Sequence, residues 1–272
     1  MYKVVAPKKS CAEAWVAACQ TIINDHDEGY NVIIDIADPV THSEKDNAVI
    51  SNVDKFLKRY DTYPIITVAN TIFPQSLLIA HGPKDFYNIY HRDFASFSET
   101  KLWGRYFERV TRHVDREGNT INPLQDLIDK LKAKEAMGTR KGSIYELAIT
   151  PTDLQRHGDD GTEMEDSDIT IYRPSKDRKL TLGGPCLSYL SFKRHPQQGL
   201  LLTVMYRNHY YITRLLGNLI GLGRLQAFVA AQTGVPLGSL TVISTHAELD
   251  KGEWGIVEAR DLVNHSAAIL ES

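Results

Sequence analysis

The strongest constraint on the fold lies in the last third of the chain, where strand-like and helix-like segments follow one another. Two apolar runs, 186–193 and 200–207, flank the turn sequence HPQQG at 195–199 and predict a β-hairpin. A long apolar helix is predicted at 212–234 and a further strand at 239–245. Three strands around one long helix indicate a sheet on which that helix packs.

The earlier part of the chain adds helices and strands without strict alternation. Helical spacing of apolar residues predicts helices at 10–24 and 122–133. Apolar runs predict strands at 31–39, 64–73 and 143–150. No GxGxxG or Walker sequence is present, so a doubly wound nucleotide-binding fold is not expected. We predict a single α+β domain over residues 1–272, a mixed sheet with packed helices.

Three glycines, Gly217, Gly221 and Gly223, lie inside the predicted helix at 212–234. Each costs about 1 kcal/mol relative to alanine in a helix interior. Glycines kept at such a cost usually allow another backbone or a ligand to come close. We therefore expect this helix, the longest one predicted, to be packed tightly.

Composition and charge exclude several classes of protein. The 272 residues carry a formal net charge of −3, which does not predict a bulk nucleic-acid binder. No apolar run approaches the roughly 20 residues that a membrane helix needs, and no CxxC or HExxH sequence indicates a metal site. Three cysteines without paired spacing favour a reducing, cytoplasmic environment over a disulfide scaffold.

Cys186 lies in a different kind of sequence from the other two cysteines, Cys11 and Cys19. Ser10 is a candidate N-cap of the first helix, and Cys19 lies with Trp15 and Ile22 on its apolar face, which predicts a core thiol. Cys186 instead follows the sequence GGP at the start of a strand. This local pattern alone leaves open whether Cys186 is a packed thiol or a nucleophile.

Polar motifs follow a definite order in the second half of the chain. They are TRK at 139–141, Pro-Cys at 185–186, YRNHYY at 206–211, Asn218, and STHAE at 244–248. Their order and spacing resemble the thymidylate synthase family, which includes the pyrimidine nucleotide hydroxymethylases. The resemblance extends from about Trp103 to Glu248. It implies a thymidylate-synthase-like fold and a homodimer with shared sites.

The resemblance implies a nucleophilic mechanism for Cys186. In that chemistry a thiolate adds to C6 of a pyrimidine, and C5 becomes able to attack a one-carbon donor. The donor implied is 5,10-methylenetetrahydrofolate. Arg207 matches the arginine that holds both the thiolate and the nucleotide phosphate.

The resemblance also implies a set of nucleotide-binding residues. Asn218 matches the asparagine that binds the base, and its amide favours uracil slightly over cytosine. His246 matches a histidine that binds the sugar, and Asn208 lies beside Arg207. Arg140 and Lys141 match a basic pair that reaches the phosphate in the neighbouring subunit.

Several positions depart from the family pattern. Leu187 stands where the family has a histidine, and Tyr210 stands where it has an aspartate. Arg214 takes the place of a glycine, and Glu248 takes the place of a tyrosine. Tyr210 is a candidate for proton transfer, with core packing as its alternative. Glu248 offers acceptors to ribose hydroxyls. The segment 68–82, where a catalytic glutamate is expected, contains no acid.

The sequence thus supports one principal hypothesis and two alternatives. The principal hypothesis is transfer of a one-carbon unit, as hydroxymethyl or methyl, to C5 of a pyrimidine nucleoside monophosphate. The first alternative is a nucleotide-binding or sensor protein that has lost the transfer reaction. The second is a different base-modifying enzyme on the same fold.

Overall fold

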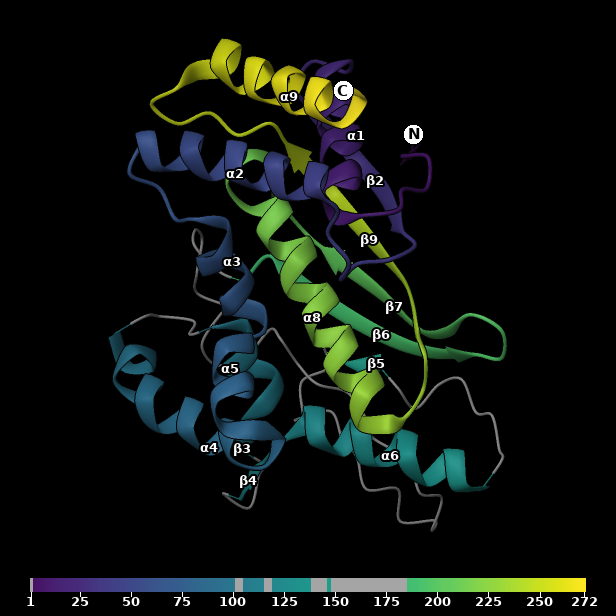
Figure 1. The fold of residues 1–272 in the computed structure, drawn as a ribbon. Coiled ribbons are helices and arrows are strands. Elements are labelled where there is room, and N and C mark those ends of the chain that lie inside the picture. The colour runs from purple at the N-terminus through teal and green to yellow at the C-terminus, as the bar shows by residue number, and fades with distance from the viewer. Residues whose placement is uncertain (1, 101–104, 115–118, 138–145, 148–184) are drawn as a thin grey trace, which may run out of the picture.

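The computed structural model describes residues 2–100, 105–114, 119–137, 146–147 and 185–272 (Figure 1). These residues form a mixed α+β domain. Its helices are α1 (Cys11–Ile23), α2 (Glu44–Arg59), α3 (Ile65–Ile72), α4 (Gln75–Thr100), α5 (Tyr106–Thr111), α6 (Pro123–Met137), α8 (Leu216–Thr233) and α9 (Gly255–Glu271). A π-helical turn, Tyr211–Leu215, leads directly into α8.

The main sheet confirms the predicted mixture of parallel and antiparallel strands. Its order is β1-β2-β9-β7-β6-β5, formed by Lys3–Val4, Glu28–Ile36, Leu237–Glu248, Gly199–Tyr206, Leu187–His195 and Glu146–Leu147. β2 pairs with β9 antiparallel, whereas β7 and β9 are parallel. The short strand β8 (His209–Tyr210) pairs with β9, and β3 (His113–Val114) pairs with β4 (Thr120–Ile121) in a separate sheet.

The predicted hairpin is confirmed as β6 and β7. Only residues 196–198 connect the two strands, and the backbone amides of Gln197 and Gln198 donate to His195 Nδ1. Gly199 adopts a φ of +80°. A Cβ atom there would lie 2.2 Å from the carbonyl oxygen of Pro236, so this position needs glycine for two reasons.

Helix α8 lies across the sheet in Figure 1 and confirms the predicted helix. It ends at Gly234, whose φ of +72° is typical of a helix C-terminus. A Cβ atom at Gly217 would lie 2.6 Å from Val68 Cβ, and one at Gly221 would lie 2.7 Å from the Ala69 carbonyl oxygen. The predicted close approach is thus made by α3 at Gly217 and Gly221, and by the loop after β2 at Gly223, where a Cβ atom would lie 2.3 Å from the Pro39 carbonyl oxygen.

Residues 64–73 correct a prediction, because they form helix α3 and not a strand. Ile65, Val68, Ala69 and Ile72 are buried, and this spacing is helical. Asp54 Oδ1 accepts a hydrogen bond from the Ile65 backbone amide at 2.8 Å and caps the first turn. Contacts with α8 and this cap outweigh the strand preference of the isoleucines, valine and threonines.

The N-terminal helix follows its sequence signals closely. Ser10 Oγ accepts a hydrogen bond from the Glu13 amide at 3.2 Å, as predicted for the N-cap. Ser10 and Glu13 have the spacing of a capping box, but the Glu13 carboxylate accepts a hydrogen bond from the backbone amide of Lys9 instead of that of Ser10. Cys19 is fully buried, which confirms the predicted core thiol.

Helix α4 spans more residues than α8, although α8 was the longest helix expected. The backbone of α4 leaves helical geometry at Gly82, directly before Pro83, so α4 consists of two shorter helices. By length and composition alone, residues 65–94 could span a membrane, although the stretch contains both α3 and part of α4 and its backbone leaves helical geometry at Gly82. Core helices of soluble proteins can have the same length and composition, so this feature does not indicate a membrane protein by itself.

Candidate active site

The hairpin places Cys186 beside Arg207. Cys186 directly precedes β6, Arg207 directly follows β7, and Leu187 pairs with Tyr206 across the two strands. The Arg207 backbone amide donates to the Cys186 carbonyl oxygen at 2.9 Å. The Arg207 side chain also hydrogen-bonds the Cys186 sulfur. The two residues matched to nucleophile and cation are therefore in contact.

The electrostatic environment of Cys186 combines opposing effects. Burial raises the pKa of the Cys186 thiol, while the charges of Arg207 and Arg214 act in the opposite direction. Burial prevails, so the resting thiol is protonated near neutral pH. Cys186 is half-buried, whereas Cys11 and Cys19 are fully buried. Among the three thiols, Cys186 is the one that a reagent or substrate can reach.

Tyr106, on α5, fixes the backbone around Cys186. Its hydroxyl oxygen accepts hydrogen bonds from the amides of Cys186 at 3.1 Å and Leu187 at 3.3 Å. Burial is the main cause that raises the pKa of Tyr106 to about 12. The neutral phenol is thus a stable anchor that connects α5 to the start of β6.

Arg214 lies in the π-helical turn before α8 and contributes a second positive charge to this region. Its guanidinium carbon lies 5.4 Å from the centre of the Tyr63 ring, in a cation–π arrangement. The position aligned with a family glycine thus carries a cation whose charge opposes the burial effect on the pKa of Cys186. This departure adds positive charge to the site.

Asn218 belongs to a buried polar network centred on His209. Asn218 Nδ2 lies 2.9 Å from His209 Nε2, and His209 Nδ1 lies 3.0 Å from Ser244 Oγ. The Tyr211 hydroxyl also donates to Ser244 Oγ, and the His209 ring stacks on Tyr206 at 4.0 Å between ring centres. Burial lowers the pKa of His209 to about 3, so the imidazole is neutral.

The neutral imidazole determines the direction of each hydrogen bond in this network. Because Asn218 Nδ2 donates to Nε2, the single ring proton resides on Nδ1 and is donated to Ser244. One N–H and the Oδ1 atom of Asn218 remain for another partner. Asn218 comes from α8, His209 from β8 and Ser244 from β9, so the network joins three elements.

His246 is held at the end of β9 by two side chains. Its Nδ1 lies 2.5 Å from Asn208 Oδ1 and its Nε2 lies 2.6 Å from Glu28 Oε1. The hydrogen bond from His246 is the largest cause that lowers the pKa of Glu28. Tyr30 pairs with His246 across β2 and β9, and the two rings are 5.1 Å apart.

The remaining predicted residues divide into two groups. Tyr210 and Glu248 pair in register on β8 and β9, and Tyr210 is 42% exposed, so it is not a core aromatic residue. Arg140 and Lys141 lie outside the described residues. Within the described part of the chain, no group of three or more His, Cys, Asp or Glu residues is arranged to hold a metal ion.

Sequence reasoning missed three residues that contact predicted ones, Tyr106, His209 and Glu28, and a fourth, Ser244, that hydrogen-bonds His209. His209 and Ser244 lie inside the quoted motifs YRNHYY and STHAE, next to residues that were singled out. Glu28 gave no local signal, because only the register of β2 against β9 brings it to His246. Glu28 thus supplies a carboxylate from β2, whereas the sequence resemblance placed the expected acid in the segment 68–82.

Comparison with known proteins adds no family assignment. No protein-family model matches the chain, and no curated protein matches its sequence. The case for a function therefore depends on the arrangement of these side chains.

Proposed function

We propose that this protein transfers a one-carbon unit to C5 of a pyrimidine nucleoside monophosphate, as hydroxymethyl or methyl, through Cys186. The observation that carries the proposal is the contact between a half-buried thiol and a guanidinium. Arg207 hydrogen-bonds the Cys186 sulfur, and Arg214 adds a second positive charge. Cationic neighbours stabilise a thiolate, which is the nucleophilic form of cysteine.

The proposed covalent step is addition of the Cys186 thiolate to C6 of the base. The new S–C6 bond takes the electron pair of the sulfur, and the C5–C6 double-bond electrons move through C5 onto O4. C5 would then attack the one-carbon unit of the donor and lose its proton, and cleavage of the bond from that carbon to the folate nitrogen would leave an exocyclic methylene on the base. Addition of water to this methylene gives the hydroxymethyl product, and addition of a hydride from the reduced folate gives the methyl product; in both cases departure of the Cys186 thiolate from C6 restores the C5–C6 double bond. Bound 5,10-methylenetetrahydrofolate would supply the one-carbon unit.

Asn218 is proposed to bind the base, with a slight preference for uracil. Since His209 takes one N–H of the Asn218 amide, the other N–H and Oδ1 remain. These suit uracil, which presents O4 as an acceptor beside N3–H as a donor. The network on His209 and Ser244 would hold the amide in this orientation.

The other proposed contacts follow the ends of the strands. Arg207 would bind phosphate, while Asn208 and His246 would bind the sugar. Tyr210 and Glu248 lie together, an exposed aromatic ring beside a carboxylate. A pterin ring has a flat face and N–H donors, so this pair suits the folate donor, and Glu248 also suits a ribose hydroxyl.

A homodimer in the cytoplasm is part of the proposal. Leu201, Met205 and Ile243 alternate with buried residues along β7 and β9 and are partly exposed on the other face of the sheet. An apolar sheet face of this kind supports packing against a second copy. Arg140 and Lys141 would then contact the phosphate in the partner's site.

One observation favours the alternative of a nucleotide-binding or sensor protein. Burial raises the pKa of Cys186 despite both arginines, so the resting thiol is not activated. A bound nucleotide phosphate would further weaken the effect of Arg207 on the sulfur. In that case the same side chains would bind the nucleotide without forming the S–C6 bond.

Release of tritium from C5-labelled nucleotides tests the proposal. UMP, dUMP, CMP and dCMP are each incubated with the protein, with and without methylenetetrahydrofolate, beside the variant Cys186→Ser. Release that requires Cys186 and is greatest with a uracil nucleotide supports transfer. Nucleotide binding without release from any of the four would support the binding protein instead.

A further inference from the structure

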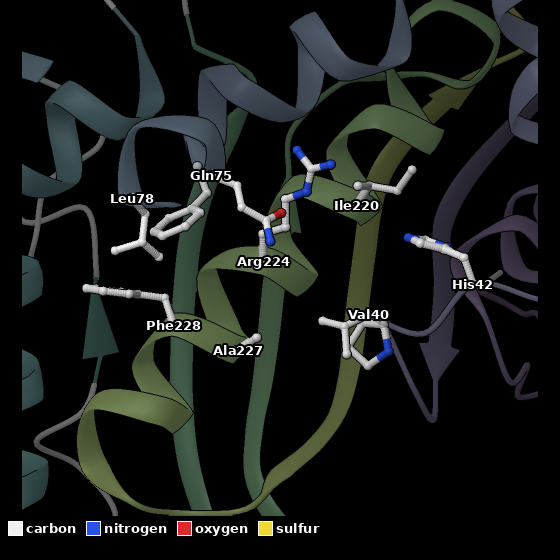
Figure 2. Close-up of a pocket in the computed structure, with 10 residues that line it drawn as sticks. Val40, His42, Gln75, Leu78, Ile220, Arg224, Ala227 and Phe228 are labelled. Carbon is white, nitrogen blue, oxygen red and sulfur yellow. The ribbon is translucent and has the colours of Figure 1, made fainter. Parts of the chain in front are cut away.

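A cavity lies beside α8, and Cys186 is not among its lining residues. Its volume is about 390 Å³, within the range of small-molecule sites. The loop after β2, the start of α4 and the middle of α8 form its walls (Figure 2), and its lining residues include Val40, His42, Gln75, Leu78, Arg224 and Phe228. Arg224 follows Asn218 by six residues, which places it about 9 Å along the helix and about 120° around it.

Arg224 is a half-buried cation that lacks a carboxylate partner within the described residues. Arg224 Nη1 donates a long hydrogen bond, 3.4 Å, to Asn70 Oδ1. Burial lowers the pKa of Arg224, which means that the surroundings do not compensate its charge fully. The Arg224 guanidinium and the Gln75 amide both line the cavity (Figure 2). Both offer N–H donors to a ligand.

His42 faces Arg224 from the opposite wall (Figure 2). Its Nδ1 atom is buried without a hydrogen-bond partner in the described part of the chain. Burial lowers the pKa of His42, so the ring is neutral. The nearby carboxylates are already engaged: Asp38 accepts from the amides of Val40 and Thr41, and Asp46 caps α2.

The rest of the cavity wall is apolar. Phe73, Leu78, Ile220 and Phe228 contribute hydrocarbon surface beside the polar groups. One uncompensated cation suits one negative charge, and the planar guanidinium fork matches a carboxylate in two hydrogen bonds. A dianionic phosphate would require a second cation, and the neighbouring Asp38 would oppose it.

We propose that this cavity binds a small monocarboxylate with an apolar tail. Its carboxylate would pair with Arg224 and accept from Gln75, while its tail would lie on Phe228 and Leu78. The site is separate from the proposed nucleotide site, and its occupancy does not depend on Cys186. It would accordingly be a site for a second ligand on the same helix that carries Asn218.

Calorimetry and thermal shift with simple probes test this site. The probes are butyrate, benzoate and 3-phenylpropanoate, with the uncharged 3-phenylpropanamide as the matched control. We expect 3-phenylpropanoate to bind and to raise Tm, and the amide to bind about 10- to 100-fold more weakly, since charge-assisted hydrogen bonds are lost. Arg224→Gln should weaken the binding of 3-phenylpropanoate by a similar factor and leave the binding of 3-phenylpropanamide unchanged.

Two variants separate binding in the cavity from other effects. Ala227→Leu fills the cavity without changing its charge and should also prevent binding. Arg59 is an exposed arginine on α2, and Arg59→Gln should leave binding unchanged. Cys186→Ser should bind the probe as the natural chain does, so the result is independent of nucleotide chemistry. Binding of none of the three carboxylates, or equal binding of 3-phenylpropanoate to Arg224→Gln, would overturn the proposal.

Discussion

His209 Nε2 accepts a hydrogen bond from Asn218 Nδ2 at 2.9 Å, and both side chains are buried. The imidazole is therefore part of the support of the residue proposed to bind the base. Its burial has a cost, because the folded chain keeps the ring neutral at a pH where free histidine takes up a proton. The contact thus links the proposed specificity of the site to the pH dependence of folding.

We predict that His209 makes the protein less stable in mild acid. Its pKa falls from an ordinary value of 6.5 to about 3 in the folded state. Between these two pH values the unfolded chain binds one more proton than the folded chain. The contribution of the neutral His209 to stability is therefore complete above pH 6.5 and is lost as pH falls toward 3. The free energy of unfolding should decrease by about 1.4 kcal/mol per pH unit from this group alone.

Urea unfolding across this pH range checks the prediction. His209→Gln should remove that slope while keeping a side chain able to accept from Asn218. His265→Gln, an exposed position on α9, is the matched control and should retain the slope. An unchanged slope in His209→Gln would show that other groups cause the acid sensitivity.

Gly223 gives a prediction in which two effects have opposite signs. Alanine is favoured over glycine in a helix by about 1 kcal/mol. A Cβ atom at Gly223, however, would lie 2.3 Å from the Pro39 carbonyl oxygen. We expect Gly223→Ala to destabilise the protein by about 1–3 kcal/mol, because overpacking outweighs the helix preference.

Thermal unfolding of two helical variants distinguishes these effects. Asn264→Ala, at an exposed position of α9, should change stability by less than about 0.5 kcal/mol. If Gly223→Ala is instead more stable than the natural chain, the loop at Pro39 moves freely away from α8. In that case the wall of the Arg224 cavity would not be rigid.

Local patterns in the sequence were sufficient for much of the fold. The hairpin, α1, α6 and α8 each have clear caps, turns or apolar spacing, and the structure confirms them. Helix α3 was mistaken for a strand, because its β-branched residues favour strands when taken alone. Its burial against Gly217 and Gly221 of α8 depends on a contact distant in sequence.

The candidate site shows the same limit in its side chains. The proximity of Cys186 and Arg207 could be predicted from the hairpin, because consecutive antiparallel strands place the start of one beside the end of the other. The contact of Glu28 with His246 spans 218 residues and follows from strand register alone. The role of His209 also depends on the third dimension, since Asn218 and Ser244 reach it from α8 and β9.

Cys186 should be the most reactive thiol of the folded protein. Burial raises the pKa of all three cysteines, but only Cys186 is partly accessible. Because Arg207 acts against the burial effect, Arg207→Gln should raise the pKa of Cys186 further. We expect alkylation by iodoacetamide near neutral pH to become about 3- to 10-fold slower.

The pH dependence of the alkylation rate measures this change directly. Arg59→Gln removes a charge from the exposed end of α2 and should leave the rate unaltered. Nucleotide added before the reagent should protect Cys186 if the proposed site is correct. Equal, slow reaction of Cys11, Cys19 and Cys186 would count strongly against a catalytic thiol.

Tyr106 provides the sharpest test of how the Cys186 backbone is held. Tyr106→Phe removes the oxygen that accepts from the amides of Cys186 and Leu187, and leaves a part-buried and a buried donor without it. We expect a loss of about 1–3 kcal/mol in the free energy of unfolding. Tyr87→Phe is the matched control, because its buried hydroxyl has no hydrogen-bond partner among the described residues.

The same pair of variants separates anchoring from general packing. Both substitutions remove one hydroxyl from a largely buried tyrosine and keep its ring. If Tyr106 anchors the strand start, Tyr106→Phe should lower Tm and change the alkylation rate of Cys186, while Tyr87→Phe should neither lower Tm nor change that rate. Equal effects of the two variants on Tm, with the Cys186 rate unchanged, would mean that β6 and β7 alone hold Cys186 against Arg207.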